Sequence, residues 1–176
     1  MKTHIAFLRG INVSGQKKIL MSDLRQMLES VGLREVQTYI QSGNVVFQSA
    51  LNPSECEQII FQEIKDTYGW EVPVLVRTFE ALSNILNNCP FEEGKREKSY
   101  YIILHSQPEK MDMLETQELS IPDEEFLITD ECIYIHYAVG AGKAKFGTNW
   151  FEKKLNVKAT ARNYNTMVKL IALFKQ

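Results

Sequence analysis

The stretch Glu35-Val36-Gln37-Thr38-Tyr39-Ile40-Gln41-Ser42-Gly43-Asn44-Val45-Val46-Phe47 predicts a β-hairpin. Its first part, Glu35–Ile40, alternates β-branched residues with Gln and Tyr, which is the period of two expected for a half-buried strand. Gln41–Asn44 is a polar segment with a glycine, typical of a tight turn, and Val45–Phe47 favours a returning apolar strand. The elements on either side of this hairpin decide the fold to which it belongs.

Each side of the hairpin supplies one strand and one helix. Ser22 is a favourable N-cap for the first helix, and Gly32 can end that helix in the left-handed conformation. Asn52-Pro53 is typical of a second helix start, and Thr78 can cap a short helix after the fourth strand. The predicted order is therefore β-α-β-β-α-β, with a strand at 3–8, a helix at 22–32, the hairpin, a helix at 54–68 and a strand at 72–78.

The same order of elements returns in the second half, which begins 96 residues later, at Ser99 against Thr3, with little sequence identity. A repeated βαββαβ unit of ferredoxin-like type predicts an α+β fold with mainly antiparallel sheets and a C-terminal helix. Residues 1–90 are expected to form the first unit with a linking helix, residues 91–176 the second unit with the C-terminal helix, and the polar segment 92–98 an exposed loop. The elements predicted in the second half are strand 99–105, helix 108–115 with Met111 and Leu114 inward, strands 125–129 and 132–137, helix 146–155, strand 157–160 and helix 163–175.

Composition indicates a globular protein without a membrane span. The 176 residues, 44% of them hydrophobic, suit one large or two small domains with a proper core. Three widely spaced cysteines without a C-x-x-C motif are expected to be reduced thiols. No stretch approaches the roughly 18 apolar residues of a membrane span, and a strand so close to Met1 leaves no room for a targeting segment. A cytoplasmic location and no membrane partner are therefore predicted.

Charge is unevenly distributed, although the formal net charge is only −2. Residues 109–131 contain nine acids and one lysine, whereas residues 138–162 contain six cations and one acid. Such asymmetry can create local electric fields that the net charge hides, and two solvated faces are the commoner outcome.

A cationic loop that contains glycine, Arg9–Lys18, joins the first strand to the first helix. Backbone amides, Arg and Lys at such a junction suit an anion such as phosphate, and a tight solvated loop is the alternative. In a split β-α-β unit the loop after strand one and the turn after strand two lie at the same end of the sheet, so we expect this loop beside Gln41–Asn44. The candidate ligand-binding residues here are Arg9, Asn12, Lys17, Lys18, Gln41 and Asn44.

A second cationic loop with glycines, Gly140–Lys145, is expected beside Thr160–Thr166, because the segments that follow strands three and four of the second unit also share one end of its sheet. Here again a glycine-rich cationic loop meets a polar helix start. The candidate ligand-binding residues here are Lys143, Lys145, Arg162, Asn163 and Asn165.

Three ordered blocks resemble a widespread bacterial family, the domain of unknown function number sixteen-ninety-seven. Leu8–Gly15 is similar to its L-R-G-I-N-V-G-G block, Tyr39–Phe47 matches Y-I-Q-S-G-N-V-V-F, and Ala159–Thr166 is similar to A-T-x-R-N-W-N-T. The resemblance covers nearly the whole chain and implies a duplicated ferredoxin-like fold and a cytoplasmic protein, but no activity. Ser14 stands where the family has glycine, which argues against an extreme backbone angle there, and Tyr164 replaces a larger aromatic.

Catalytic signals are weak, so the catalytic residues stay unknown and an enzymatic role stays uncertain. His4, His105 and His136 lie on predicted strands, where a histidine is more often structural than a base. Ser42 lacks the preceding glycine of a G-x-S-x-G elbow, and Gly140–Ala144 lacks the spacer of a P-loop. His, Cys and carboxylates are not clustered at metal-ligand spacings, so we expect neither a metal nor a cofactor.

The function favoured by these patterns is binding of a phosphate-bearing small molecule or a short nucleic acid through the two loop clusters. One alternative is an enzyme acting on such a ligand, with Arg9, Asn12 and Lys143 stabilising charge. Another is an interaction protein whose acidic segment 109–131 meets a basic partner. The oligomeric state is not indicated. Aromatic residues on the strands could stack on RNA bases or belong to the core; they are Phe47, Tyr100, Tyr101, Tyr134 and Tyr137.

Overall fold

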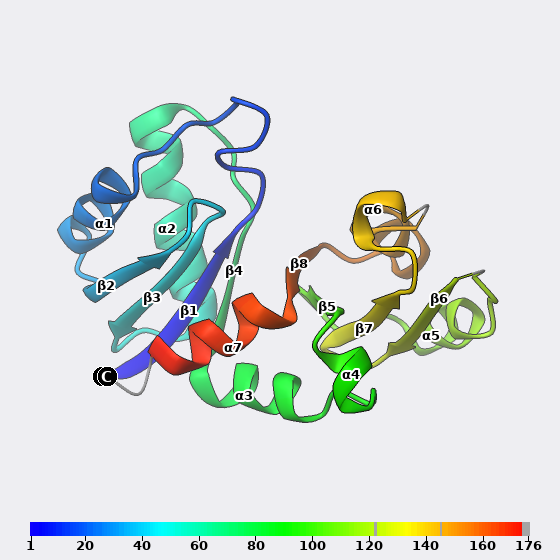
Figure 1. Cartoon of the computed structure of the whole chain (residues 1–176). Helices are drawn as coiled ribbons and strands as arrows, with labels where there is room; N and C mark the ends of the chain where they lie inside the picture. The colour runs from blue at the N-terminus through cyan, green and yellow to red at the C-terminus, as the bar shows by residue number, and fades with distance from the viewer. Residues whose placement is uncertain (122, 145, 174–176) are drawn as a thin grey trace. The chain divides into compact units, whose positions relative to one another are not determined.

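The computed structural model describes residues 1–121, 123–144 and 146–173. The chain divides into two compact units. The first is discontinuous, because it comprises Met1–Ser83 and the chain from Lys169, whereas Asn84–Val168 form the second. Each unit contains one four-stranded antiparallel sheet (Figure 1).

The first unit has the predicted βαββαβ order. Its sheet has the strand order β2-β3-β1-β4, in which the hairpin strands lie beside β1, and β4 forms the other edge. This order is the one expected for a ferredoxin-like unit, so the predicted fold class is confirmed for this half. The elements are β1 (Lys2–Leu8), α1 (Met21–Ser30), β2 (Arg34–Tyr39), β3 (Asn44–Ser49), α2 (Pro53–Tyr68) and β4 (Val74–Thr78).

Helices α1 and α2 cover one face of the first sheet (Figure 1). Leu24 of α1 and Ile60 of α2 are buried in the same apolar cluster as Leu8, Val45 and Val76 from three strands. Burying one such side chain contributes about 1.5–3 kcal/mol relative to leaving it exposed. This helix-covered face is therefore a main source of stability in the unit.

The second unit repeats the topology of the first. Its sheet has the order β6-β7-β5-β8, which is the first unit's order with each strand replaced by its counterpart. The duplication predicted from the order of elements is therefore confirmed. The elements are β5 (Ser99–Leu104), α5 (Lys110–Gln117), β6 (Glu124–Ile128), β7 (Cys132–Tyr137), the 3-10 turn η1 (Ala141–Lys143), α6 (Thr148–Leu155) and β8 (Ala159–Asn163).

Hydrogen bonds at the end of the first strand are repeated in both units. Two successive backbone N–H groups donate there, the first to the hairpin turn and the second to the residue before the last strand. The donors are Leu8 and Arg9 in one unit and Leu104 and His105 in the other, and they are related by the 96-residue offset predicted from the sequence for Thr3 and Ser99. The four bonds are Leu8 N to Gly43 O (2.7 Å), Leu104 N to Glu131 O (2.9 Å), Arg9 N to Pro73 O (3.0 Å) and His105 N to Lys158 O (2.8 Å).

The repeated unit also includes one further helix. Helix α3 (Phe79–Asn87) follows β4 directly, as α7 (Tyr164–Leu173) follows β8. The last strand residue caps each helix: Thr78 Oγ1 accepts from the N–H of Ala81 (3.2 Å), and Asn163 Oδ1 accepts from the N–H of Thr166 (2.9 Å). The duplicated sequence is therefore βαββαβα.

Several local predictions were wrong. Ser22 does not cap α1, because the helix begins one residue earlier and the Ser22 hydroxyl donates to the Asp23 carboxylate (3.1 Å). The segment 92–98 contains a helical turn, α4 (Glu93–Arg96). Met111 and Leu114 are 65% and 53% exposed, because α5 buries Thr116 instead.

Helix length matters for the membrane prediction. Within the part of the chain that the structure describes, no helix combines the length and the apolar composition that crossing a bilayer requires.

Candidate functional site

Asn12 ties together the cationic loop, the start of α1 and the hairpin turn. Its side-chain amide donates to the carbonyl oxygens of Gln41 (2.9 Å) and Ile19 (3.0 Å), and its Oδ1 accepts from the N–H of Ile19 (2.9 Å). The predicted contact between Arg9–Lys18 and Gln41–Asn44 is therefore confirmed. Because both amide hydrogens are used, Asn12 shapes the site as a clamp and offers a ligand no donor from its side chain.

A cavity of about 420 Å³ lies beside this clamp. Three of the predicted residues line the cavity: Asn12, which is half-buried, and Lys18 and Gln41, which are exposed. Its lining also includes an apolar run that continues into α1 and that the sequence patterns did not indicate as part of a site. The lining residues are Asn12, Gly15, Lys18, Ile19, Leu20, Met21 and Gln41.

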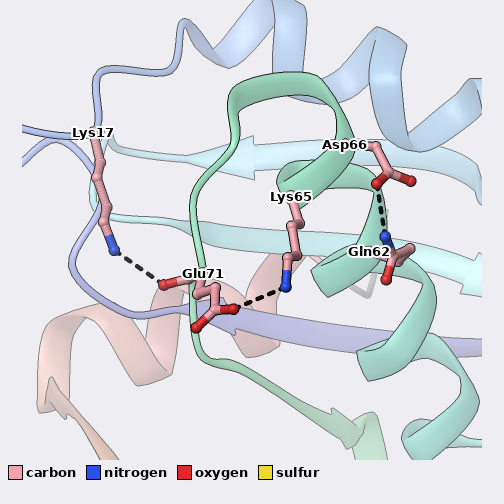
Figure 2. Close-up of polar contacts among 5 residues, drawn as sticks. All are labelled: Lys17, Gln62, Lys65, Asp66 and Glu71. Atoms are coloured by element: carbon pink, nitrogen blue, oxygen red, sulfur yellow. Dashed lines mark hydrogen bonds and ion pairs between the residues drawn. The ribbon is translucent and has the colours of Figure 1, made fainter.

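Lys17 lies in the same loop but points to another segment (Figure 2). Its Nζ donates to the backbone oxygen of Glu71 (3.0 Å), and the Glu71 carboxylate pairs with Lys65 Nζ (2.8 Å). The hydrogen bond from Lys65 holds the pKa of the Glu71 carboxyl below its usual value. Lys17 therefore fastens the loop to the segment before β4, and Lys18 is the cation that lines the cavity.

Asn44 and Gly43 support the turn from inside. Asn44 is fully buried, and its amide donates to the oxygens of Tyr39 (3.2 Å) and Ser42 (3.0 Å). A Cβ on Gly43 would come within 2.7 Å of both Cβ and O of Leu8, so only glycine fits there. Asn44 was predicted as a ligand-binding residue, but its burial makes it a structural residue of the turn.

The loop uses left-handed backbone at several positions. The φ angles are 55° at Asn12, 50° at Ser14, 75° at Gly15 and 46° at Lys17. The expectation that Ser14, in place of a glycine, would avoid such an angle was wrong. Single residues in this region cost about 1–2 kcal/mol each, so the surrounding hydrogen bonds must hold the loop in this shape.

Sheet topology brings the two segments of the second loop cluster to the same end of the sheet. Strands β7 and β8 both lie antiparallel to β5, so Gly140–Ala144 and the residues after β8 share one end of the sheet, as predicted. Ala144 and Ala161 pack against the same apolar cluster. Lys143 and Asn165 are exposed, and Lys145 lies outside the described residues.

Arg162 and Asn163 belong to β8, which extends beyond its predicted end at Thr160. The Arg162 guanidinium donates to Thr160 Oγ1 (3.0 Å) and to the carbonyl of Ala161 (2.8 Å), and burial lowers the pKa of Arg162 to about 10. Arg77 holds the equivalent place before the cap of α3 and makes the same bond to the preceding carbonyl (2.9 Å). Since the repeat reproduces this contact, and Asn163 caps α7, both residues have structural roles.

The two loop clusters occupy opposite ends of the repeated unit. Arg9–Lys18 follows the first strand, and its counterpart in the second unit, His105–Glu109, contains no Lys or Arg. The counterpart of the Gln41–Asn44 turn carries the acids Asp130 and Glu131. The duplication therefore did not preserve the charge of this end.

Two further cavities in the second unit were not predicted. One, of about 430 Å³, has two lysines that belong to the basic run 138–162, which was the available signal in the sequence. The other, of about 440 Å³, includes Asp130 and Glu131. The cavity of about 430 Å³ is lined by Asn149, Glu152, Lys153, Asn156, Val157 and Lys158. The cavity of about 440 Å³ is lined by Ile85, Asn88, Met113, Ile128, Thr129, Asp130, Glu131 and Tyr134.

Aromatic residues of the strands belong to the core. Phe47, Tyr101, Tyr134 and Tyr137 are buried, and Tyr100 is half-buried against Tyr137, with ring centroids 5.5 Å apart. Base stacking on a sheet face requires exposed rings, so this alternative loses its support. Among residues 1–121, 123–144 and 146–173, no three His, Cys, Asp or Glu residues are grouped so that they could hold a metal ion.

The chain is similar to a bacterial protein of known structure and to one protein family. A solved structure described as that of conserved bacterial protein SP0830 from Streptococcus pneumoniae superposes with a TM-score of 0.74 at 23% sequence identity, over 100% of this chain and 99% of that one. This likeness shows a shared fold. No curated protein matches the sequence. Residues 1–134 match the family described as Protein of unknown function (DUF1697), and the chain therefore belongs to this family.

Proposed function

We propose that the protein binds a phosphate-bearing small molecule or a short nucleic acid at the cavity of the first unit. The observation that carries this proposal is the lining of that cavity: Lys18 and Gly15 of the cationic loop face it together with Gln41 of the hairpin turn. A cavity of about 420 Å³ suits a small ligand, since small-molecule pockets typically measure roughly 300–1,000 Å³.

Cationic and amide groups at this site favour an anionic ligand. Lys18 supplies a point charge with three donors, and the exposed Gln41 amide can donate and accept. Lys17 and Arg9 add positive charge to the same loop. Lys143 and Asn165 of the second loop cluster are exposed, so a second anion site in the second unit stays a prediction.

Titration of the purified protein with inorganic pyrophosphate and with a short single-stranded oligonucleotide, followed by calorimetry, tests the proposal. Lys18→Glu should weaken binding of whichever probe binds by at least about 1.5–3 kcal/mol, the value of a lost charged hydrogen bond. Affinity should also fall as salt rises, because exposed charges are screened over about 8–10 Å at physiological ionic strength.

Lys2→Glu is the matched control, because Lys2 is an exposed lysine at the other end of β1 and carries the same charge change. The affinity of this variant should stay within a factor of about two to three of the wild type, since β1 separates Lys2 from the cationic loop by about 20 Å, at about 3.3 Å per residue, and exposed charges are screened over about 8–10 Å. Equal effects of the two substitutions, or binding that is indifferent to salt, would overturn the proposal.

A further inference from the structure

Three exposed apolar residues belong to the segments that line the cavity of the first unit, and one of them, Leu20, lines the cavity itself. Val13, Leu20 and Ile40 are 56%, 68% and 51% exposed, and they lie in three different segments: the cationic loop, the entry to α1 and the hairpin turn. Single exposed apolar residues are common on protein surfaces, so the informative one is Leu20, which is exposed and also lines the cavity.

The Asn12 clamp ties together the three backbone segments to which these residues belong. Asn12 is the neighbour of Val13, and its amide bonds to the carbonyls of Ile19 and Gln41, which are the neighbours of Leu20 and Ile40. Hydrogen bonds of about 3 Å therefore hold these backbone segments next to one another. Ile40 is even held at φ of 49°, a conformation that β-branched residues avoid.

The cavity lining has the same mixed character as its surroundings. Ile19, Leu20 and Met21 supply an apolar wall, and Lys18 supplies the positive charge. An inorganic anion would use only the lysine side and would leave the apolar wall in water. An apolar ligand without charge would leave the lysine without a counterion.

We infer that the cavity takes an amphiphilic anion, an organic phosphate whose aromatic or aliphatic body lies against the apolar wall while its phosphate meets Lys18. This inference rests on the proposed function and names the ligand class of the same site. Covering about 55–60 Å² of apolar surface would tighten binding about tenfold relative to the bare phosphate.

Affinities for inorganic phosphate, 1-naphthyl phosphate and hexyl phosphate, measured by calorimetry on the full chain, test the inference. At least one organic phosphate should bind about tenfold or more tightly than inorganic phosphate, and the two bodies distinguish an aromatic from an aliphatic preference. Leu20→Gln should remove this gain, so that the variant binds the organic phosphates and inorganic phosphate with similar affinities. Lys18→Gln should weaken all three probes.

Leu127→Gln is the matched control, because Leu127 is an exposed leucine of the second unit. Organic phosphates that bind no better than inorganic phosphate would overturn the inference and leave the proposed function standing. A gain that Leu127→Gln removes as well as Leu20→Gln would also overturn it. If none of the probes binds in a way that depends on Lys18, both the inference and the proposed function are overturned.

Discussion

At the scale of single residues, a comparison of Gly10 with Gly43 measures how much the close contact between Gly43 and Leu8 would cost if a side chain were added in the hairpin turn. Both have φ of 79°, but a Cβ would meet nothing within 4 Å at Gly10, whereas at Gly43 it would come within 2.7 Å of Leu8. Gly10→Ala should therefore cost about 1–2 kcal/mol for the left-handed backbone alone. Gly43→Ala should cost about 1–3 kcal/mol more, because the backbone of β1 would have to move. Urea unfolding of both variants measures the difference, and equal losses would contradict this account of the turn.

His4 should make the protein less stable in mild acid. Burial lowers the pKa of this histidine below its ordinary value of 6.5, and the charge of Lys2 lowers it further. The unfolded state therefore binds more protons between the folded-state pKa and 6.5, so the free energy of unfolding falls as the pH falls through this window and is constant in this respect above it. One proton corresponds to a slope of at most about 1.4 kcal/mol per pH unit.

Comparison with His4→Gln isolates this contribution, since all other titrating groups are shared. Urea unfolding of the wild type at several values between pH 7.5 and pH 5 should show a steeper loss of stability than unfolding of the variant, by a slope of up to about 1.4 kcal/mol per pH unit. Parallel curves would show that His4 does not titrate differently in the two states.

Helix α2 shows, at the scale of an element, how a sequence signal becomes stability. Asn52 Oδ1 accepts from the N–H of Glu55 (3.0 Å), and the Glu55 carboxylate accepts from the N–H of Asn52 (2.8 Å), which is a complete capping box before Pro53. Asn52→Ala should cost about 1 kcal/mol, equivalent to about 2–4 °C in Tm for a chain of this length. Ser54→Ala in the same exposed turn is the control, and circular dichroism melts in which both variants lose equally would contradict the capping assignment.

The order of elements could be predicted because each follows from a local pattern: the alternation in Glu35–Ile40, the cap at Asn52, the apolar period in α2. The start of α1 could not, because the N-cap residue, Leu20, has no capping side chain and Ser22 lies two residues after it, inside the helix. The buried side of α5 also escaped prediction, since its hydrophobic residues lie on no single stripe and Met111 stays exposed. Tertiary packing overrides weak local preferences at such places.

The candidate site was predictable in its location but not in its detail. Sheet topology alone brings Arg9–Lys18 to Gln41–Asn44, and this follows from the order of strands. The clamp of Asn12 depends on carbonyl groups 7 and 29 residues away, which no sequence pattern marks. The burial of Asn44 likewise follows from packing, so a polar residue that looked available to a ligand supports the turn instead.

The whole molecule is a duplication in which one unit is interrupted by the other along the chain. The first unit contains the residues from Lys169 as well as Met1–Ser83. Removing the residues from Lys169 should therefore destabilise the sheet of the first unit. A chain ending at Val168 should show faster hydrogen exchange in β1–β4 than the full chain, while the amides of β5–β8 should be less affected. Equal changes in the two sheets would contradict this division of the chain.

The discontinuous first unit also has a consequence for how the protein is made. A ribosome adds about 5–20 residues per second, so the 85 residues Asn84–Val168 separate the two parts of this unit by roughly 4–17 s of translation. During that interval the strands of the first sheet have been translated, but the helical segment that completes the first unit has not. The second unit, in contrast, is translated as one continuous segment. The half of the protein that is translated first is therefore the half that is completed last.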